Sequence, residues 1–285
     1  GINMKNLKIR EDFLPYCLPD ISDKEIDSML GTLKSGWLAK GPKTLEFQHK
    51  FAESVGAKYA IGLNSCTAAL FLALKCYNIG PGDEVIVPAM TFSASANTIL
   101  HCGATPVFAD IDPETGCIDT ESIKSKITSR TKAIVPVHYS GLPCDLDTIY
   151  EIADEHGLIV SEDAAHAVRT FYKGRAIGNK VRNTASFSFY ATKNLATGEG
   201  GMLVTDDEAV YNRAIMLASH GMDANAWKRY GKGGSWQYDI IEPGYKYNMF
   251  DLQAALGLIQ LSRMDEMQAK RFELVSIYDS AFKQL

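Results

Sequence analysis

Short apolar runs alternate with longer segments along the first two thirds of the chain. Within each run most consecutive positions are apolar, which is typical of strands buried on both faces of a parallel sheet. The runs are KYAIGL, DEVIVPA, TPVFADI, KAIVPVH and GLIVSED, and the helix-length segments between them are 66–79, 92–102, 120–128 and 145–157. The pattern predicts successive β-α-β units, and therefore an α/β fold with a mostly parallel sheet between helices.

Local signals predict further elements. Ser22 and Glu25 in LPDISDKEID form a capping-box pattern that starts a helix. The run ASFSFYAT predicts another strand, and the glycine-rich segment 230–236 predicts an exposed loop. From 251 to 285 the apolar residues keep a helical spacing, which predicts one long helix.

We therefore expect three parts: an N-terminal segment over 1–13, a large α/β domain over 14–250 and the long helix over 251–285. The three residues ahead of Met4 are interpreted as a tag remnant.

Composition narrows the class of protein. The 285 residues are 46% hydrophobic and 22% charged, as in ordinary globular proteins, and a net charge of -5 without a basic cluster argues against a nucleic-acid partner. Because no apolar run reaches membrane-spanning length and no signal-peptide pattern is present, we expect no membrane partner and a cytoplasmic location. The six cysteines lack any C-x-x-C pair, so buried free thiols are expected rather than a zinc site or disulfides.

Polar residues at strand ends are the first candidates for chemistry, because ligands of open α/β sheets bind beyond the carboxyl ends of the strands. Glu162 and Asp163 end the run GLIVSED, although an aspartate there could also cap a helix. In NSCTAALFLAL, the backbone amides of Ser65, Cys66 and Thr67 would lie at a helix N-terminus, which binds phosphate readily. Helix capping by Asn64 or Ser65 is the structural alternative. Neither G-x-x-x-x-G-K-[ST] nor G-x-G-x-x-G is present, which excludes P-loop and dinucleotide fingerprints.

Lys193 lies between ASFSFYAT and the glycines of GEGG, which allow a ligand to approach the backbone closely. A lysine partly sheltered from water has a lowered pKa and can attack a carbonyl, whereas a solvated loop lysine is the commoner case. Together with Asp163 and the helix amides, Lys193 makes up the parts of a pyridoxal-phosphate site. The lysine would form the Schiff base, the aspartate would pair with the pyridinium nitrogen, and the amides would hold the phosphate.

Many collinear segments resemble those of one enzyme family. They are LPYCLPDIS, LKSGWLAKGPK, NSCTAALFLAL, GPGDEVIVPAMTFSASAN, GATPVFADIDPETG, VPVHYSGLPCDLD, SEDAAHA, SFSFYATKNLATGEGG and GYKYNMFDLQAALGLIQL. From residue 14 to about 285 the chain resembles the DegT/DnrJ/EryC1/StrS family of nucleotide-sugar aminotransferases. The resemblance implies the aspartate-aminotransferase fold (fold type I), with pyridoxal phosphate bound by the large domain. Family members continue into a small C-terminal domain, which we expect this chain to lack.

The resemblance assigns roles to four residues around the cofactor ring. Lys193 would carry pyridoxal phosphate as a Schiff base and move protons, and Asp163 would keep the pyridine nitrogen protonated. Phe92 would stack on the ring, with a core aromatic as the alternative. His166 would approach the cofactor's phenolic oxygen.

Five further residues are implied at the edges of the site. Cys66, Thr67 and Ser188 would hold the phosphate. Lys246 and Asn248 lie in a segment that matches the one the family inserts from a neighbouring subunit. They would complete the site across the interface of a homodimer.

The implied reaction moves an amino group from glutamate, through pyridoxamine phosphate, to a 3-keto or 4-keto nucleotide sugar used in cell-envelope or lipopolysaccharide synthesis. The segments VPVHYSG, EDAAHAV with YKGRAIG, and PGYKYN further resemble the branch that makes UDP-4-amino-4-deoxy-L-arabinose.

Two other functions stay open. Sugar dehydratases of the family carry histidine at the lysine position, so Lys193 argues against them. A non-catalytic protein that binds pyridoxal phosphate or sugar is the other alternative, because we expect the chain to lack the small C-terminal domain. Arg169 stands where the family more often has a small residue, and would either pair with an acid or contact substrate.

Overall fold

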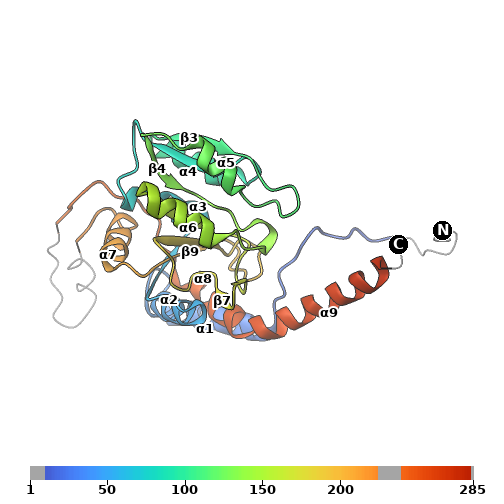
Figure 1. The fold of residues 1–285 in the computed structure, drawn as a ribbon. Coiled ribbons are helices and arrows are strands. Elements are labelled where there is room, and N and C mark those ends of the chain that lie inside the picture. Colours follow the sequence, from blue (N-terminus) through green and yellow to red (C-terminus); the bar gives the residue numbers. More distant parts are fainter. Residues whose placement is uncertain (1–9, 224–238, 284–285) are drawn as a thin grey trace.

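A seven-stranded sheet forms the centre of the molecule in the computed structural model, which describes residues 10–223 and 239–283 (Figure 1). In spatial order the strands are β1 (Tyr59–Leu63), β9 (Gly201–Thr205), β8 (Thr184–Ser188), β5 (Ile159–Asp163), β4 (Thr131–Ile134), β2 (Glu84–Pro88) and β3 (Thr105–Ala109). Among these seven strands, β9 alone runs against the direction of the other six. The mostly parallel sheet and the six strands expected from sequence are confirmed, and β9 is an addition. A separate hairpin pairs β6 (Phe171–Tyr172) with β7 (Arg175–Ala176).

Helices cover both faces of the sheet (Figure 1). The core on one face includes residues of α2 (Pro42–Val55), α5 (Thr120–Lys126), α6 (Leu146–His156) and α8 (Asp251–Ser262). The core on the other face includes residues of α3 (Cys66–Cys76), α4 (Ser93–His101) and α7 (Glu208–Leu217). Successive strand residues feed opposite cores, as Ile86 and Val87 do, because side chains alternate along a strand. This two-sided burial is the reason that the strands read as unbroken apolar runs.

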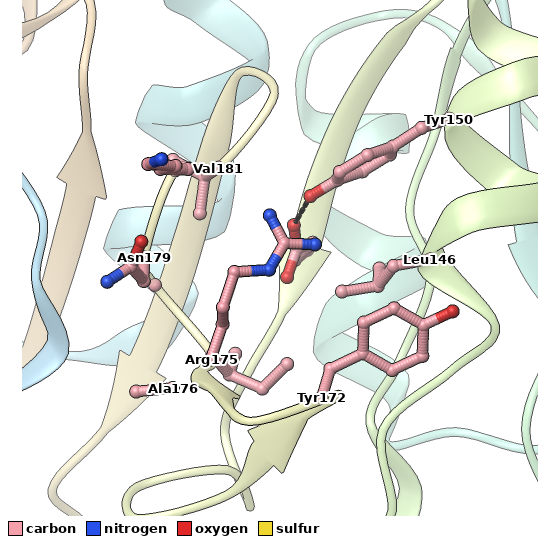
Figure 2. Close-up of a pocket in the computed structure, with 11 residues that line it drawn as sticks. Leu146, Tyr150, Tyr172, Arg175, Ala176, Asn179 and Val181 are labelled. Carbon is pink, nitrogen blue, oxygen red and sulfur yellow. Dashed lines mark hydrogen bonds between the residues drawn. The ribbon is translucent and has the colours of Figure 1, made fainter.

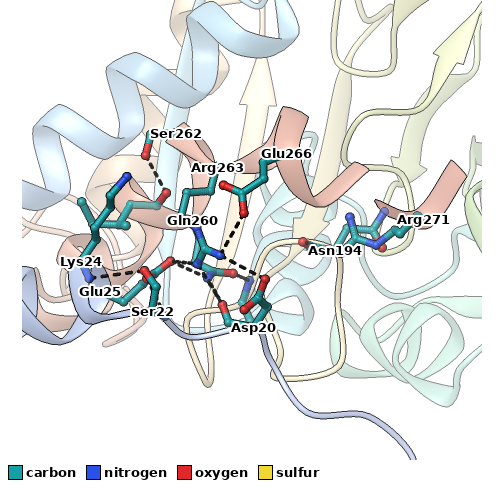
Figure 3. A network of polar contacts seen from close by, with 12 residues as sticks. Asp20, Ser22, Lys24, Glu25, Asn194, Gln260, Ser262, Arg263, Glu266 and Arg271 are labelled. Atoms are coloured by element: carbon teal, nitrogen blue, oxygen red, sulfur yellow. Dashed lines mark hydrogen bonds and ion pairs between the residues drawn. The ribbon is translucent and has the colours of Figure 1, made fainter. Parts of the chain in front are cut away.

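Helix α1 (Asp23–Ser35) packs against α8 and begins with the predicted capping box of Ser22 and Glu25. Glu25 is fully buried and also accepts hydrogen bonds from Gln260 (2.9 Å) and Arg263 (2.7 Å), which Figure 3 shows together. Burial alone would raise the pKa of Glu25. The hydrogen bonds from Ser22, Arg263 and Gln260 outweigh it and lower this pKa to about 2. The start of the described chain is thereby tied to its last helices.

The predicted long helix over 251–285 is two helices, which corrects the expectation. α8 ends at Ser262, and α9 (Met264–Phe282) begins after Arg263, whose φ of -100° and ψ of 2° leave the helical region. The Arg263 side chain is nearly buried and pairs with Asp20 as well as Glu25. Neither glycine nor proline marks this break, and the apolar residues keep their helical spacing across it, so the sequence alone predicts one continuous helix.

The structure confirms part of the expectation for the cysteines, and two other expectations concern residues that it does not describe. Five of the six cysteines are buried free thiols as predicted, but Cys17 is exposed. The predicted loop at 230–236 and the three residues ahead of Met4 lie outside the described residues. Across residues 10–223 and 239–283, no helix combines the length and the apolar character needed to cross a membrane.

Candidate active site

A cavity of about 700 Å³ lies at the carboxyl edge of the sheet. Side chains that follow β1, β2, β5 and β8 line it, as expected where parallel strands end together. Seven of the nine predicted site residues are in its wall: Cys66, Thr67, Phe92, Asp163, His166, Ser188 and Lys193. These residues are spread over more than 120 positions of sequence, so the fold brings them together.

Lys193 sits in the connection between β8 and β9, where its amide donates to the carbonyl of Tyr190 at 2.9 Å. The side chain is half-buried in the cavity wall, and burial lowers its pKa. Two side chains from the last helices hold the same connection: the Arg271 guanidinium donates to the carbonyl of Asn194 (3.1 Å), and Gln260 accepts from Ala196 (3.3 Å). Arg271 and Asn194 face each other in Figure 3. Lys193 is therefore held in place rather than carried on a solvated loop.

Asp163 ends β5 and is buried, with its carboxylate at the cavity. One oxygen, Oδ1, accepts from the amide of Ala165 at 3.1 Å, and the other, Oδ2, accepts from the hydroxyl of Ser95 at 2.7 Å. Its backbone is fixed as well, because the amide of His138 donates to its carbonyl at 3.1 Å. Since no α-helix begins at Asp163, the helix-cap interpretation does not hold.

The N-terminus of α3 forms another part of the cavity wall. Ser65 caps the helix by accepting from the amide of Ala68, so the amides of Cys66 and Thr67 stand ahead of the first intrahelical bonds. The Cys66 thiol is buried, donates to the carbonyl of Ser186, and has a raised pKa because of burial. Cys66 can thus offer an anion its amide but not its side chain.

Phe92, His166 and Ser188 complete the predicted wall. Phe92 is 78% exposed, so it is not a core aromatic. The Nδ1 atom of His166 accepts from the amide of Ser140 (3.2 Å), which places the proton of the neutral ring on Nε2. Burial and then the charge of Lys193 lower the pKa of His166, which favours that neutral form.

Lys246 and Asn248 do not line the cavity within the same chain. Their backbones form isolated bridges, Lys246 with Ser219 and Asn248 with Leu63 at the edge of β1. Lys246 is exposed, and the side-chain oxygen of Asn248 is buried without a hydrogen-bond partner among the described residues. A role for these two residues across a dimer interface stays a prediction.

Glu162 precedes Asp163 but belongs to a different environment. Its carboxylate accepts from His138 Nε2 (2.9 Å) and from the hydroxyl of Tyr150, and it lines a separate small hollow. Tyr150 and Arg175 extend toward one another in this hollow (Figure 2). Burial and the charge of Glu162 raise the pKa of Tyr150, so its phenol stays protonated. Of the two strand-end carboxylates, only Asp163 lines the candidate site.

Arg169 pairs with Asp265 on α9, which agrees with the first of its two predicted roles. It also lines a second hollow of about 710 Å³ that adjoins the first. The two hollows share Tyr16, His166, Thr192 and Lys193. Lys193 therefore stands where both spaces meet.

Sequence reasoning missed Thr91 and Ser95, which connect the cavity wall to Asp163. The available signal was a pair of hydroxyl residues around the helix start in TFSAS, with Thr91 ahead of the helix and Ser95 in its first turn. It was overlooked because serines near a helix start usually cap it.

The family model for the DegT/DnrJ/EryC1/StrS aminotransferases matches residues 19–285. The chain belongs to this family. It is 58% identical over 276 residues to the spore coat polysaccharide biosynthesis protein SpsC of Bacillus subtilis, covering 97% of this chain and 71% of SpsC. Among solved structures, Spr1654 from Streptococcus pneumoniae in its PMP form gives a TM-score of 0.89 at 38% identity, covering 95% of this chain and 72% of that one. Helicobacter pylori PseC, an aminotransferase involved in pseudoaminic acid biosynthesis, gives 0.86 at 32%, with 95% and 71% covered.

Membership of the DegT/DnrJ/EryC1/StrS family makes the chain a pyridoxal-phosphate-dependent sugar aminotransferase of fold type I. The pyridoxal phosphate and pyridoxamine phosphate forms of Spr1654 point to the same cofactor. The chemistry of the cavity fits that group. Helix amides suited to a phosphate lie in the same wall as a buried carboxylate suited to a pyridinium nitrogen, together with a lysine of lowered pKa.

Proposed function

We propose that this chain transfers the amino group of glutamate to the keto group of a nucleotide sugar, at C4 or C3, for the synthesis of cell-envelope polysaccharide. The observation that supports the reaction best is the meeting of Lys193, Asp163 and the amides of Cys66 and Thr67 around one cavity. The likeness to SpsC, whose name refers to spore coat polysaccharide, favours a cell-surface product.

Each residue has a distinct task in this proposal. Pyridoxal phosphate, when bound, supplies an electron sink for negative charge at the substrate carbon. Lys193 would hold the cofactor and would move a proton at the substrate carbon, which its lowered pKa favours. Asp163 would keep the pyridine nitrogen protonated, and His166 would donate its Nε2 proton to the phenolic oxygen. Phe92 would cover the ring, and the α3 amides with Ser188 would hold the phosphate.

The hollow beside Lys193 is the proposed place for the sugar, because it opens from the lysine and has its own polar wall. A UDP-linked 4-keto pentose is the first substrate to examine, on the strength of VPVHYSG, YKGRAIG and PGYKYN. We further propose that Lys246 and Asn248 reach the cofactor of a second subunit in a homodimer, since neither lines the cavity of its own chain.

Borohydride reduction tests the cofactor site directly. The purified chain is incubated with pyridoxal phosphate, reduced, digested and analysed by mass spectrometry, and we expect a reduced adduct on Lys193. A folded protein that gives no adduct there would contradict the proposal.

Glutamate then separates the alternative functions. A transaminase should lose the visible absorbance of the bound cofactor and release 2-oxoglutarate when glutamate is added, whereas a non-catalytic binding protein should leave the spectrum unchanged. A panel of UDP-linked and dTDP-linked 3-keto and 4-keto sugars, followed by detection of the amino sugar, then identifies the acceptor. Loss of water from the sugar without amination would favour a dehydratase.

A further inference from the structure

The carboxylate of Asp163 is held by a side chain from a different element. Ser95, the third residue of α4, is fully buried and donates its hydroxyl proton to Asp163 Oδ2 at 2.7 Å. A serine inside a helix commonly bonds a backbone carbonyl one turn earlier. Ser95 bonds side chains on both sides instead, because its oxygen also lies 2.8 Å from the hydroxyl of Thr91.

The direction of these bonds follows from counting protons. An ionised carboxylate can only accept, so the single proton of Ser95 is committed to Asp163. The bond between the two hydroxyls must then run from Thr91 to Ser95. Thr91 lines the cavity, and with its own proton turned inward it offers the cavity only an acceptor.

Both oxygens of Asp163 are consequently occupied on the protein side, Oδ1 by the amide of Ala165 and Oδ2 by Ser95. Two donors from separate elements fix the rotation of the carboxylate and stabilise its charge, since hydrogen bonds to ionised groups are stronger than neutral ones. A carboxylate preorganised in this way is suited to accept one further hydrogen bond in a fixed direction.

We propose that Ser95, supported by Thr91, is a positioning residue that orients Asp163 for its hydrogen bond with the cofactor's pyridinium nitrogen. This inference rests on the proposed function, because it takes Asp163 as the partner of that nitrogen. It adds that the contact is set by a directed chain of two hydroxyls, from Ser95 in α4 and from Thr91 two residues ahead of that helix.

Ser95→Ala tests the proposal, with binding as the readout rather than turnover. Loss of one hydrogen bond to a charged group should raise the dissociation constant for pyridoxal phosphate about tenfold. Binding of inorganic phosphate, measured by competition, should not change, because the proposed phosphate site consists of the α3 amides and Ser188 and does not include Asp163. Ser95→Cys keeps most of the volume but replaces a strong donor by a weak one, so it should resemble Ser95→Ala.

Ser161→Ala is the matched control. Ser161 is equally buried, lies two residues before Asp163 on β5, and pairs its hydroxyl with Thr184 at 3.1 Å rather than with Asp163. The Ser161→Ala variant should lose about as much stability as Ser95→Ala does, but it should bind pyridoxal phosphate with wild-type affinity. In an Asp163→Asn background, Ser95→Ala should add less than a twofold further change, because coupled residues are not additive.

Three results would overturn the inference: wild-type affinity in Ser95→Ala, an equal loss of phosphate binding in that variant, or wild-type affinity in Ser95→Cys, which would make volume the cause. Wild-type protein that forms no complex with pyridoxal phosphate would overturn the proposed function as well, and so is distinguishable from these three.

Discussion

Glu25→Gln should destabilise the protein in a manner that depends on pH. The pKa of Glu25 falls from its usual 4.5 to about 2 in the folded chain. At about 1.4 kcal/mol for each unit, this corresponds to about 3 kcal/mol of stabilisation when the carboxylate is ionised. The other acids that pair with Arg263 are more than half exposed, Asp20 at 51% and Glu266 at 56%. Solvent therefore screens the ion pair between Glu25 and Arg263, and we expect Glu25→Gln to lower the free energy of unfolding by about 2 kcal/mol at pH 7.

The sign of the pH dependence follows from the depressed pKa. The stabilisation is complete above the unfolded value near 4.5 and is lost as the pH falls toward 2, so the two proteins should converge in acid. Urea unfolding at pH 7, 5 and 3 measures this difference. Glu266→Gln is the matched control, since it lies 3.7 Å from the same guanidinium but is exposed, and it should cost well under about 1 kcal/mol. An equal loss at pH 7 and pH 3 would refute the reasoning, because it would assign the effect to packing rather than to charge.

Three further changes address the site and its scaffold. Lys193→Ala should abolish transamination and the borohydride adduct while pyridoxal phosphate still binds non-covalently, as followed by fluorescence quenching; appreciable turnover would exclude Lys193 as the essential base. Gly201→Ala should weaken binding of pyridoxal phosphate and of inorganic phosphate together, measured by titration, because its Cβ would lie 2.4 Å from the carbonyl carbon of Ser65 at the α3 N-terminus. Asp251→Ala should cost about 3 kcal/mol in urea unfolding, because the buried Asp251 carboxylate accepts from the amides of Gly41 (2.8 Å) and Thr44 (2.9 Å) and so caps α2 from a distant helix.

Local sequence predicts the parts of this fold that local physics decides. Unbroken apolar runs gave the parallel strands because both faces of the sheet are covered, and the capping box gave the start of α1. The break at Arg263 was not predictable in this way, because the side chain at the break pairs with Glu25 and Asp20, which lie 238 and 243 residues earlier. The same limit applies to Ser95, whose partner Asp163 is 68 residues away.

The residues of the candidate site also differ in whether the local sequence predicts them. Lys193 and Asp163 could be nominated because each is an unusual residue in its local setting, a cation among glycines and an acid at the end of an apolar strand. Asp251 shows the opposite case. In the sequence it resembles any acidic residue in the first turn of a helix, here α8. In the structure its carboxylate accepts hydrogen bonds from backbone amides at the start of α2.

The pair Glu162 and Asp163 shows how one strand end supports both structure and chemistry. The side chains of consecutive residues of β5 point to opposite faces of the sheet. Glu162 therefore forms hydrogen bonds with Tyr150 and His138 on one face, whereas Asp163 lines the cavity. His138 joins the two environments, because its ring donates to Glu162 and its backbone amide donates to the carbonyl of Asp163. Because Nδ1 of this ring accepts from the amide of Cys144 at 3.2 Å, the ring proton lies on Nε2, which donates it to Glu162. The position of the Asp163 carboxylate is thus fixed from two directions, by Ser95 and the amide of Ala165 at its oxygens and by the His138 and Glu162 pair at its backbone.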